Sequence, residues 1–513
     1  MLAQAHTFTI QGPRARHVLV ELDVRPGLPA FTIVGLADAA VREARERIQT
    51  AIRNCGLEFP SRRITTNLAP GELPKAGAGL DLAIACALLA ATGQLEREPL
   101  RDVALFGELA LDGRLRASHG TLAVAHAARE CGLRRLAVAR SSAWEASLID
   151  GLEVAPIGSL SSAVRMLRGG PPDRLPPKPS SAATTEQPHS PAPALPDLAD
   201  VRGQAHAVGA LVVAAAGGHS IMLSGPPGTG KTMLARRLPS ILPPLGRSEA
   251  IVAMLVASST GAPLEDPPRE RPFRAPHHTI SAAGLVGGAG STSIGEVVRA
   301  HRGVLFLDEL SEFTRPTLEA LRQPLEDGQV SIARAGYTSA YPSRFMLVAA
   351  TNPCPCGYAS EPDRCRCTAG ERARHARRLS GPLLDRIDIH VSLALQRNGD
   401  HSSQATVSST QAREQVAGAR ARQAARLESE GISLNAEMGA HLFRTHLHLG
   451  EGGRRVLAGA VDCGLLSARG EHRVLRVART LADLDGSNEV RACDVGAALA
   501  YRCFGRQSDP GAP

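Results

Sequence analysis

Aromatic residues are scarce in this 513-residue chain, which has one tryptophan, four tyrosines and ten phenylalanines. Any hydrophobic core must therefore be built mainly from alanine, leucine, valine and isoleucine. Long apolar runs are also missing, because the best candidate, residues 82–91, is far shorter than the roughly 18 to 20 residues of a membrane span. The first ten residues lack the basic start and apolar block of a secretory signal. These absences predict a cytoplasmic protein with no membrane partner.

The charge balance is basic, with a net charge of +8 and a pI of about 9.2. This balance favours an anionic partner, of which nucleic acid is the commonest. An arginine-rich surface without any partner is the alternative. Apolar content of 43% and charged content of 21% are typical of a globular protein, and the length suggests roughly three domains.

Residues 225–232 read GPPGTGKT and fit the phosphate-loop pattern G-x-x-x-x-G-K-[ST]. An apolar run at 221–223 predicts a strand before the loop, and 233–238 predict a helix after it, ended by Pro239. The glycines let successive N–H groups face phosphate oxygens; Lys231 would reach the β- and γ-phosphates of ATP, and Thr232 would ligate Mg²⁺. The residues predicted to bind the nucleotide are Gly225, Pro226, Pro227, Gly228, Thr229, Gly230, Lys231 and Thr232.

A second nucleotide motif lies about 75 residues further on, at 304–309, where four apolar residues precede Asp308 and Glu309. This is the pattern of a Walker B strand. In a parallel sheet its carboxyl end lies beside the phosphate loop. Asp308 is then predicted to hold Mg²⁺, mostly through water, and Glu309 to orient and polarise the attacking water.

Composition divides the chain into four parts. Residues 1–168 mix strand and helix patterns and predict an α/β domain with its own core. Residues 169–196 are rich in proline, alanine and serine and predict an extended linker. Residues 197–395 contain both nucleotide motifs, and residues 396–513 predict a helical domain with helices at 411–430 and 467–483.

Four of the ten cysteines lie within fourteen residues, as two C-x-C pairs: Cys354, Cys356, Cys365 and Cys367. Paired soft thiolates on glycine- and proline-rich loops suit a tetrahedral, structural Zn²⁺ site. Disulfides are the alternative, although the expected compartment disfavours them. The other six cysteines are scattered and predict plain thiols.

Three stretches of the first domain carry a family resemblance. GLPAFTIVGLAD, NLAPGELPKAGAGLDLAIA and FGELALDGRLR resemble the amino-terminal domain of the magnesium-chelatase-like AAA+ proteins of the ComM/YifB family. That domain is similar in fold to the proteolytic domain of Lon, which uses a Ser–Lys dyad. The matching stretch here, residues 74–79, contains no serine, and residues 121–122, where the lysine would fall, are not basic. Without a nucleophile we expect no peptidase activity.

The resemblance implies an AAA+ fold, that is, a phosphate-loop parallel sheet with a helical lid, and further catalytic residues. Asn352, at the end of an apolar strand, matches sensor 1, which helps to fix the attacking water. Arg386 matches the arginine finger, which reaches the γ-phosphate held by a neighbouring subunit. A simple pair with Asp385 or Asp388 is the alternative for Arg386. A finger between subunits implies a homo-oligomeric ring, a hexamer by resemblance.

Two further arginines receive roles by the same resemblance. Arg469 matches sensor 2, which contacts the nucleotide from above, with Arg473 and Arg476 as competitors. The alternating residues 330–337 predict a β-hairpin of the kind that faces the pore in related helicases. Arg334 on this hairpin is the candidate for a DNA phosphate contact, and a solvated charge is the alternative.

The passage between the two nucleotide motifs resembles a family insertion that projects toward the pore, with residues 285–288 as its mobile tip. His277 and His278 lie just before it. Adjacent histidines on an extended strand would point to opposite faces, which predicts no shared metal site.

By resemblance, the work done with ATP is that of a DNA helicase or translocase that promotes branch migration in recombination during natural transformation. Two other classes stay open. One is the motor subunit of a metal chelatase, and the other is a chaperone-like protein remodeller.

Overall fold

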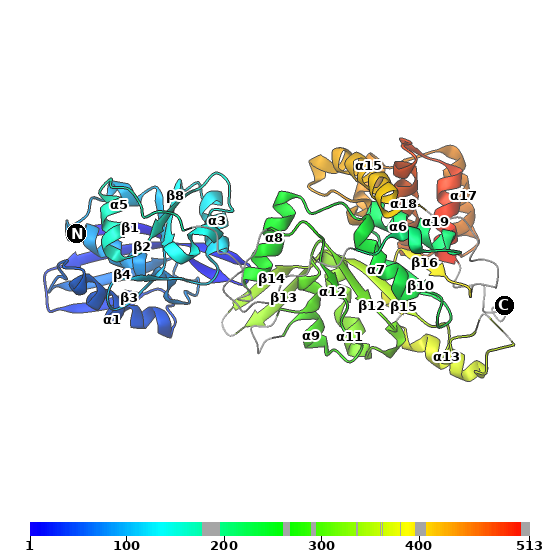
Figure 1. Cartoon of the computed structure of the whole chain (residues 1–513), viewed down its shortest axis with the longest axis horizontal. Coiled ribbons are helices and arrows are strands. Elements are labelled where there is room, and N and C mark those ends of the chain that lie inside the picture. The colour runs from blue at the N-terminus through cyan, green and yellow to red at the C-terminus, as the bar shows by residue number, and fades with distance from the viewer. Residues whose placement is uncertain are drawn as a thin grey trace. The chain divides into compact units, whose positions relative to one another are not determined.

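The computed structural model describes residues 1–176, 195–259, 267–288, 294–334, 337–359, 361, 363–379, 381–395 and 407–503 (Figure 1). The chain forms two compact units. The first comprises residues 1–188, 250–267 and 331–341, and the second comprises 189–249, 268–330 and 342–513. Each is described by itself.

The first unit contains a seven-stranded mixed sheet in the order β3-β4-β2-β1-β5-β8-β9. Its strands are β1 (Leu2–Gln11), β2 (Arg14–Arg25), β3 (Ala30–Val34), β4 (Arg63–Ala69), β5 (Val103–Phe106), β8 (Arg135–Ala139) and β9 (Glu153–Ile157), and β6 (Glu108–Leu109) pairs separately with β7 (Leu115–Arg116). In β2 every second residue from Val18 to Val24 is buried, as strand periodicity predicts for one core-facing surface. The predicted α/β domain is confirmed.

Helices of the first unit cover this sheet: α1 (Ala39–Asn54), α2 (Asp81–Ala91), α3 (Thr121–Glu130), α4 (Ala143–Ala146) and α5 (Leu160–Leu167). Every residue of α2 is buried, because its alanine and leucine side chains pack on all sides. Asp81 is the one charged residue of α2, and its carboxylate accepts hydrogen bonds from Arg47 at 2.8 and 3.0 Å. Burial nevertheless raises the pKa of Asp81 to about 6.

Gly79, the position that matches the Lon serine, leaves little room for a side chain. A Cβ atom on Gly79 would lie 2.3 Å from the Phe106 ring. Lys75 is fully buried, and its ammonium group donates to the carbonyl of Pro70. Burial lowers the pKa of Lys75. The prediction that the domain is not a peptidase stays a prediction.

The second unit is built on a five-stranded parallel sheet in the order β11-β12-β15-β10-β16. Its strands are β11 (Phe273–Arg274), β12 (Val304–Leu307), β15 (Met346–Thr351), β10 (Ile221–Ser224) and β16 (Ile389–Ser392). Ile221 of β10 lies between Val348 of β15 and Ile389 of β16 in register. The two predicted nucleotide motifs therefore end on the same carboxyl edge of one sheet, as the sequence predicts.

Helices of this part of the chain are α6 (Ala205–Gly217), α7 (Lys231–Ile241), α8 (Arg247–Ser258), α9 (Ala282–Val286), α10 (Glu296–Arg299), α11 (Arg315–Ala320), α12 (Arg322–Asp327), α13 (Ala369–Arg378) and α14 (Gly381–Leu384). The prediction that Pro239 ends the helix after the phosphate loop is wrong, because α7 continues to Ile241. Leu238 and Ile241 are fully buried, and this packing outweighs the hydrogen bond that proline cannot donate.

The carboxyl-terminal helices are α15 (Ser409–Leu427), α16 (Phe443–His446), α17 (Glu451–Asp462), α18 (Ala468–Leu484) and α19 (Ala492–Cys503), with the short strands β17 (His448–Leu449) and β18 (Glu489–Val490) paired among them. They gather beside α6 (Figure 1). Asp483 of α18 accepts from Arg426 of α15 at 2.8 Å and from Arg479 at 2.9 Å. The predicted helical lid is confirmed. None of the described helices is long and apolar enough to cross a bilayer.

The predicted hairpin forms as β13 (Gln329–Arg334) and β14 (Tyr337–Pro342). Arg334 ends β13, and its side chain lies outside the described residues. The expectation of a mobile tip at 285–288 is wrong for Leu285, which is fully buried. Gly287 forms a bridge with Ile294, and residues 289–293 are outside the described part.

Candidate nucleotide-binding site

The phosphate loop runs from the end of β10 to the start of α7. Gly230, immediately before α7, has a φ of 85°, which a residue with a side chain rarely adopts. The buried Thr229 hydroxyl donates to the carbonyl of Pro226 at 2.9 Å. The loop therefore leads into the amino terminus of α7, where free backbone N–H groups and the helix dipole favour an anion.

Lys231 lies at the centre of this site. Its ammonium group donates to the carbonyls of Gly225 at 2.7 Å and Pro226 at 2.8 Å, and to Asn352 Oδ1 at 3.1 Å. Burial lowers the pKa of Lys231, and the carboxylates of Asp308 and Glu309 oppose that shift. The lysine is thus held by acceptors that a phosphate group can replace.

The Walker B carboxylates meet the loop from β12. Asp308 Oδ2 accepts from the Thr232 hydroxyl at 2.7 Å, so the two predicted Mg²⁺ ligands are already adjacent. Glu309 has a φ of 52°, a left-handed conformation that turns its exposed side chain away from the strand. Its Oε2 lies 3.7 Å from His278 Nδ1, and His278 is a neighbour that the sequence patterns do not indicate.

The histidine pair before the insertion is arranged differently from the prediction. His277 and His278 lie in a turn, and their ring centroids are 4.0 Å apart. The alternation argument fails because it applies only to extended strands. The described residues place one group of potential metal ligands together, and the histidines are not in it.

Asn352 follows β15 and completes the carboxyl edge. Its side chain accepts from Lys231, and its backbone carbonyl accepts from His375 Nε2 of α13 at 2.9 Å. The amide nitrogen of Asn352 is therefore the part left to contact a nucleotide or a water molecule. Lys231, Thr232, Asp308, Glu309 and Asn352 converge at one edge of the sheet, and we call this group the phosphate-loop site.

The remaining two predicted catalytic residues, Arg386 and Arg469, lie elsewhere. They line a pocket of about 390 Å³ with Gly303, Phe345 and Asp388. Those three residues precede β12, β15 and β16, so the pocket lies at the amino edge of the sheet. The strands between the two edges are four to six residues long, or about 13 to 20 Å. We call this cavity the arginine pocket, and no residue of the phosphate loop lines it.

Arg386 pairs with neither of the expected aspartates. It donates to Glu326 and to the carbonyl of Pro382 at 2.7 Å, and its side chain is only 10% exposed. Asp388 instead accepts from Arg473 at 2.5 Å and contacts His219 at 3.1 Å. The charge of Arg473 and the hydrogen bond with His219 outweigh burial and lower the pKa of Asp388. The Arg473 side chain is therefore held in an ion pair with Asp388, whereas the Arg469 side chain is exposed.

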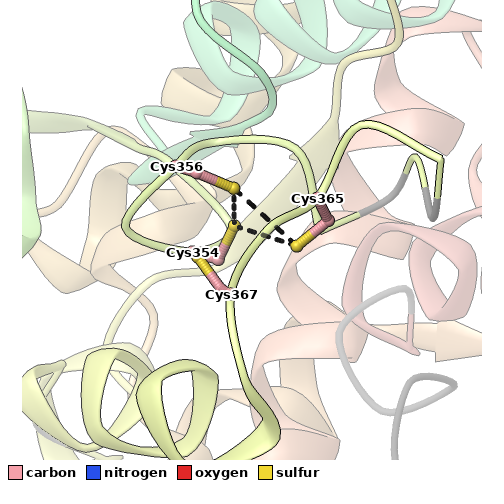
Figure 2. Close-up of side chains that lie close together, drawn as sticks. All are labelled: Cys354, Cys356, Cys365 and Cys367. Carbon is pink, nitrogen blue, oxygen red and sulfur yellow. Dashed lines mark hydrogen bonds between the residues drawn. The ribbon is translucent and has the colours of Figure 1, made fainter.

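The four clustered cysteines converge, as the spacing predicts (Figure 2). Cys354 Sγ lies 3.4 Å from Cys356 Sγ and 3.9 Å from Cys365 Sγ, and the latter two sulfurs are 3.7 Å apart. All four sulfurs, including that of Cys367, lie within 4.8 Å of one another. These separations exceed the roughly 2.05 Å of a disulfide, so the disulfide alternative is not realised. We call this group the four-cysteine cluster.

Comparisons with known proteins agree with both units. Family models of magnesium chelatase subunit ChlI match residues 20–142 and 197–401. A family model of the ChlI C-terminal region matches residues 406–502. The chain is 39% identical to competence protein ComM of Haemophilus influenzae and 41% identical to the uncharacterized protein YifB of Escherichia coli, with 98% of each chain covered. An uncharacterized protein of Mycobacterium tuberculosis is 44% identical, with 98% of this chain and 99% of the relative covered. The chain belongs to the magnesium-chelatase-like ComM/YifB family.

Family membership makes the second unit an AAA+ ATPase domain of the magnesium chelatase type. Three features of its site were not predicted from the sequence: His278 beside Glu309, His375 on the carbonyl of Asn352, and the approach of Gly357 to the phosphate loop. A lone histidine or glycine carries no sequence signal of such a contact. The PHHT context of His278 and the PCG context of Gly357 could have drawn attention to those two residues, and His375 has no comparable context.

Proposed function

We propose that the second unit binds MgATP at the phosphate-loop site and hydrolyses it. The observation that carries the proposal is the approach of Thr232 to Asp308 at 2.7 Å beside Lys231, which forms a Mg²⁺-triphosphate site from two distant motifs. Glu309 polarises the attacking water, and Asn352 orients it. Mg²⁺-dependent release of phosphate from ATP by the purified chain tests this, and no release at any protein concentration contradicts it.

The active form is a homo-oligomeric ring, a hexamer by family resemblance. Arg386 and Arg469 line the edge of the sheet opposite to the phosphate loop, so they cannot contact the nucleotide held by their own chain. In a ring, the amino edge of one subunit meets the phosphate-loop site of the next. Arg386 then exchanges Glu326 for the γ-phosphate as the arginine finger, and Arg469 contacts the same nucleotide.

The work done with ATP is that of a DNA helicase or translocase that promotes branch migration during natural transformation. The relative named competence protein ComM supports this role, as does the basic balance of the chain. Exposed arginines on α13 add a local basic surface: Arg372, Arg374, Arg377 and Arg378. Arg334 on the β13–β14 hairpin is the candidate phosphate contact in the pore. Cytoplasmic location follows from this role.

A DNA-stimulated ATPase assay separates this function from the alternatives. Single- or double-stranded DNA should raise the ATPase rate, and binding should weaken with salt in proportion to the number of phosphates contacted. Arg334→Ala should lower the salt slope by about one phosphate, while a neighbouring change at exposed Ser331 should not. An ATPase rate that DNA does not change, together with no DNA binding at low salt, contradicts the helicase role.

The family descriptions favour a second candidate, the ATPase subunit of a magnesium chelatase. In that case a porphyrin-binding partner, and not DNA, would stimulate hydrolysis. A chaperone-like remodeller would respond to an unfolded protein instead. Running the same assay with these three effectors distinguishes the three classes.

The four-cysteine cluster is proposed to bind one structural Zn²⁺. Four thiolates around an ion at about 2.3 Å lie roughly 3.8 Å apart in a tetrahedron, and the separations of 3.4 to 3.9 Å among the sulfurs of Cys354, Cys356 and Cys365 fit that spacing. Four thiolates leave no open coordination position, which favours a structural role over a catalytic one. Elemental analysis should find about one zinc per chain.

A further inference from the structure

The four-cysteine cluster lies in a segment with almost no core of its own. Among the described residues of 353–379, only Cys354, Gly357 and His375 are buried. α13, which ends the segment, buries His375 alone, and it begins with a capping box between Thr368 and Glu371 immediately after the last cysteine. Apolar burial therefore contributes little to holding this segment in place, and a metal ion in the cluster would add order that the core does not supply.

Both ends of the segment meet at Asn352. The chain leaves Asn352 and reaches Cys354 two residues later. It returns through Cys367 into α13, whose His375 donates to the Asn352 carbonyl at 2.9 Å. The Asn352 side chain in turn accepts from Lys231 at 3.1 Å. The four-cysteine cluster thus closes a loop whose entry and exit both fix one residue of the phosphate-loop site.

The same segment contacts the phosphate loop directly. A Cβ atom on Gly357 would lie 2.4 Å from Pro227 Cδ, so the backbone after Cys356 rests against the loop at a distance that only glycine allows. Gly357 also has a φ of 86°, in the left-handed region. The ring of Pro227 is therefore supported by the turn that carries two of the four thiolates.

We propose that a zinc ion in the four-cysteine cluster positions Asn352 and the phosphate loop, so that ATP turnover depends on the metal. The inference rests on the proposed ATPase function and on the proposed zinc site. Asn352 is here a positioning residue for the attacking water, and the ion acts only through it and through Pro227. Binding of MgATP depends less on the ion, because Lys231 and Thr232 belong to α7 and are held by the core.

The first test removes the ligands. The double variant Cys365→Ser, Cys367→Ser should contain no zinc by elemental analysis and should lower kcat by about 10²-fold, as for a displacement of roughly 1 Å at a reacting group. The dissociation constant of a fluorescent MgATP analogue should change only slightly. Cys463→Ser, a change at an exposed cysteine outside the cluster, is the matched control and should keep both zinc and kcat.

The second test breaks the connection but keeps the metal. His375→Ala should retain one zinc per chain and still lower kcat, because the carbonyl of Asn352 loses its donor from α13 and keeps only the Thr351 hydroxyl at 3.2 Å. Asn352→Ala should lower kcat, and adding the two cysteine changes to it should cause a smaller loss than they cause in the wild-type chain, since the route through Asn352 is already removed and only the route through Pro227 remains. Full additivity, or a wild-type kcat without zinc, overturns the proposal.

A readout independent of hydrolysis separates the failure of this inference from failure of the ATPase. Removal of zinc should increase backbone hydrogen exchange in peptides covering 225–232 and 346–352 and leave α2 of the first unit unchanged. If the zinc-bound chain hydrolyses no ATP, the ATPase proposal fails. The hydrogen-exchange experiment then tests by itself whether the zinc ion positions Asn352 and the phosphate loop. Unchanged exchange in both peptides refutes the positioning role, and a chain purified without chelator that contains no zinc refutes the site.

Discussion

Lys231 is the residue on which nucleotide binding in this site depends most directly. Its ammonium group has three acceptors, two of them backbone carbonyls that bound phosphates would displace. Lys231→Ala should abolish ATP hydrolysis and weaken MgATP binding, measured by phosphate release and by a fluorescent analogue. Arg236→Ala, at an exposed position of the same helix, should leave both unchanged. Equal losses in the two variants would point to a damaged helix and not to a lost phosphate contact.

A change at Glu309, again a single residue, should distinguish MgATP binding from ATP hydrolysis. Because its side chain is exposed and its nearest ionisable partner is His278 at 3.7 Å, Glu309→Gln should bind MgATP with nearly normal affinity. Loss of the carboxylate that polarises water should reduce kcat by about 10² to 10⁴-fold. Glu312→Gln, three residues further on and also exposed, is the matched control. A Glu309→Gln variant with normal turnover refutes the assignment of the catalytic carboxylate.

At the scale of an element, the turn between α10 and β12 contains a buried histidine that makes stability depend on pH. His301 Nδ1 accepts the backbone N–H of Arg344 at 3.1 Å, which requires the neutral ring. Burial, reinforced by Arg302 and Arg344, lowers the pKa of His301 to about 3.

The unfolded chain therefore binds a proton at His301 below about pH 6.5, whereas the folded chain does not until about pH 3. The free energy of unfolding should fall as the pH decreases through this window. His301→Gln should remove up to about 1.4 kcal/mol per pH unit of that dependence, measured by denaturant unfolding at pH 7 and pH 5. An identical slope in the variant shows that other groups account for the dependence.

At the scale of the whole molecule, different groups of residues lie at the two edges of the parallel sheet. The carboxyl edge holds the phosphate-loop site, and the amino edge holds the arginine pocket. Under the proposed function, a single chain contains both halves of the catalytic site but cannot combine them within itself. Assembly into the proposed ring would use both.

Mixing two inactive variants tests this arrangement. Arg386→Ala should lower kcat by about 10³ to 10⁵-fold, as for other arginine fingers, without weakening MgATP binding. Combined with Lys231→Ala subunits, it should regain part of the activity, because some interfaces pair an intact phosphate loop with an intact Arg386. Steady-state hydrolysis against mixing ratio measures this. A chain that stays monomeric with nucleotide, or an active Arg386→Ala variant, contradicts the ring.

The ATPase motifs could be predicted from the sequence because each is a contiguous run. The strand, the glycine loop and the helix around Lys231, and the apolar strand before Asp308, form locally and reveal themselves through spacing. The four cysteines were likewise predictable, since two short loops bring thiolates together once the backbone turns. The α/β class and the carboxyl-terminal helices followed from hydrophobic periodicity, whereas the helical lid was implied by the family resemblance.

Contacts between distant segments were decided only by the tertiary structure. Arg386 pairs with Glu326, sixty residues away, and not with the adjacent aspartates. Arg469 lies on the edge opposite to the phosphate loop, and His375 and Gly357 connect the four-cysteine cluster to the nucleotide site. The physical reason is that periodicity and motif spacing report local backbone geometry. Which side chains meet depends instead on strand order and on the buried packing that brings remote segments together.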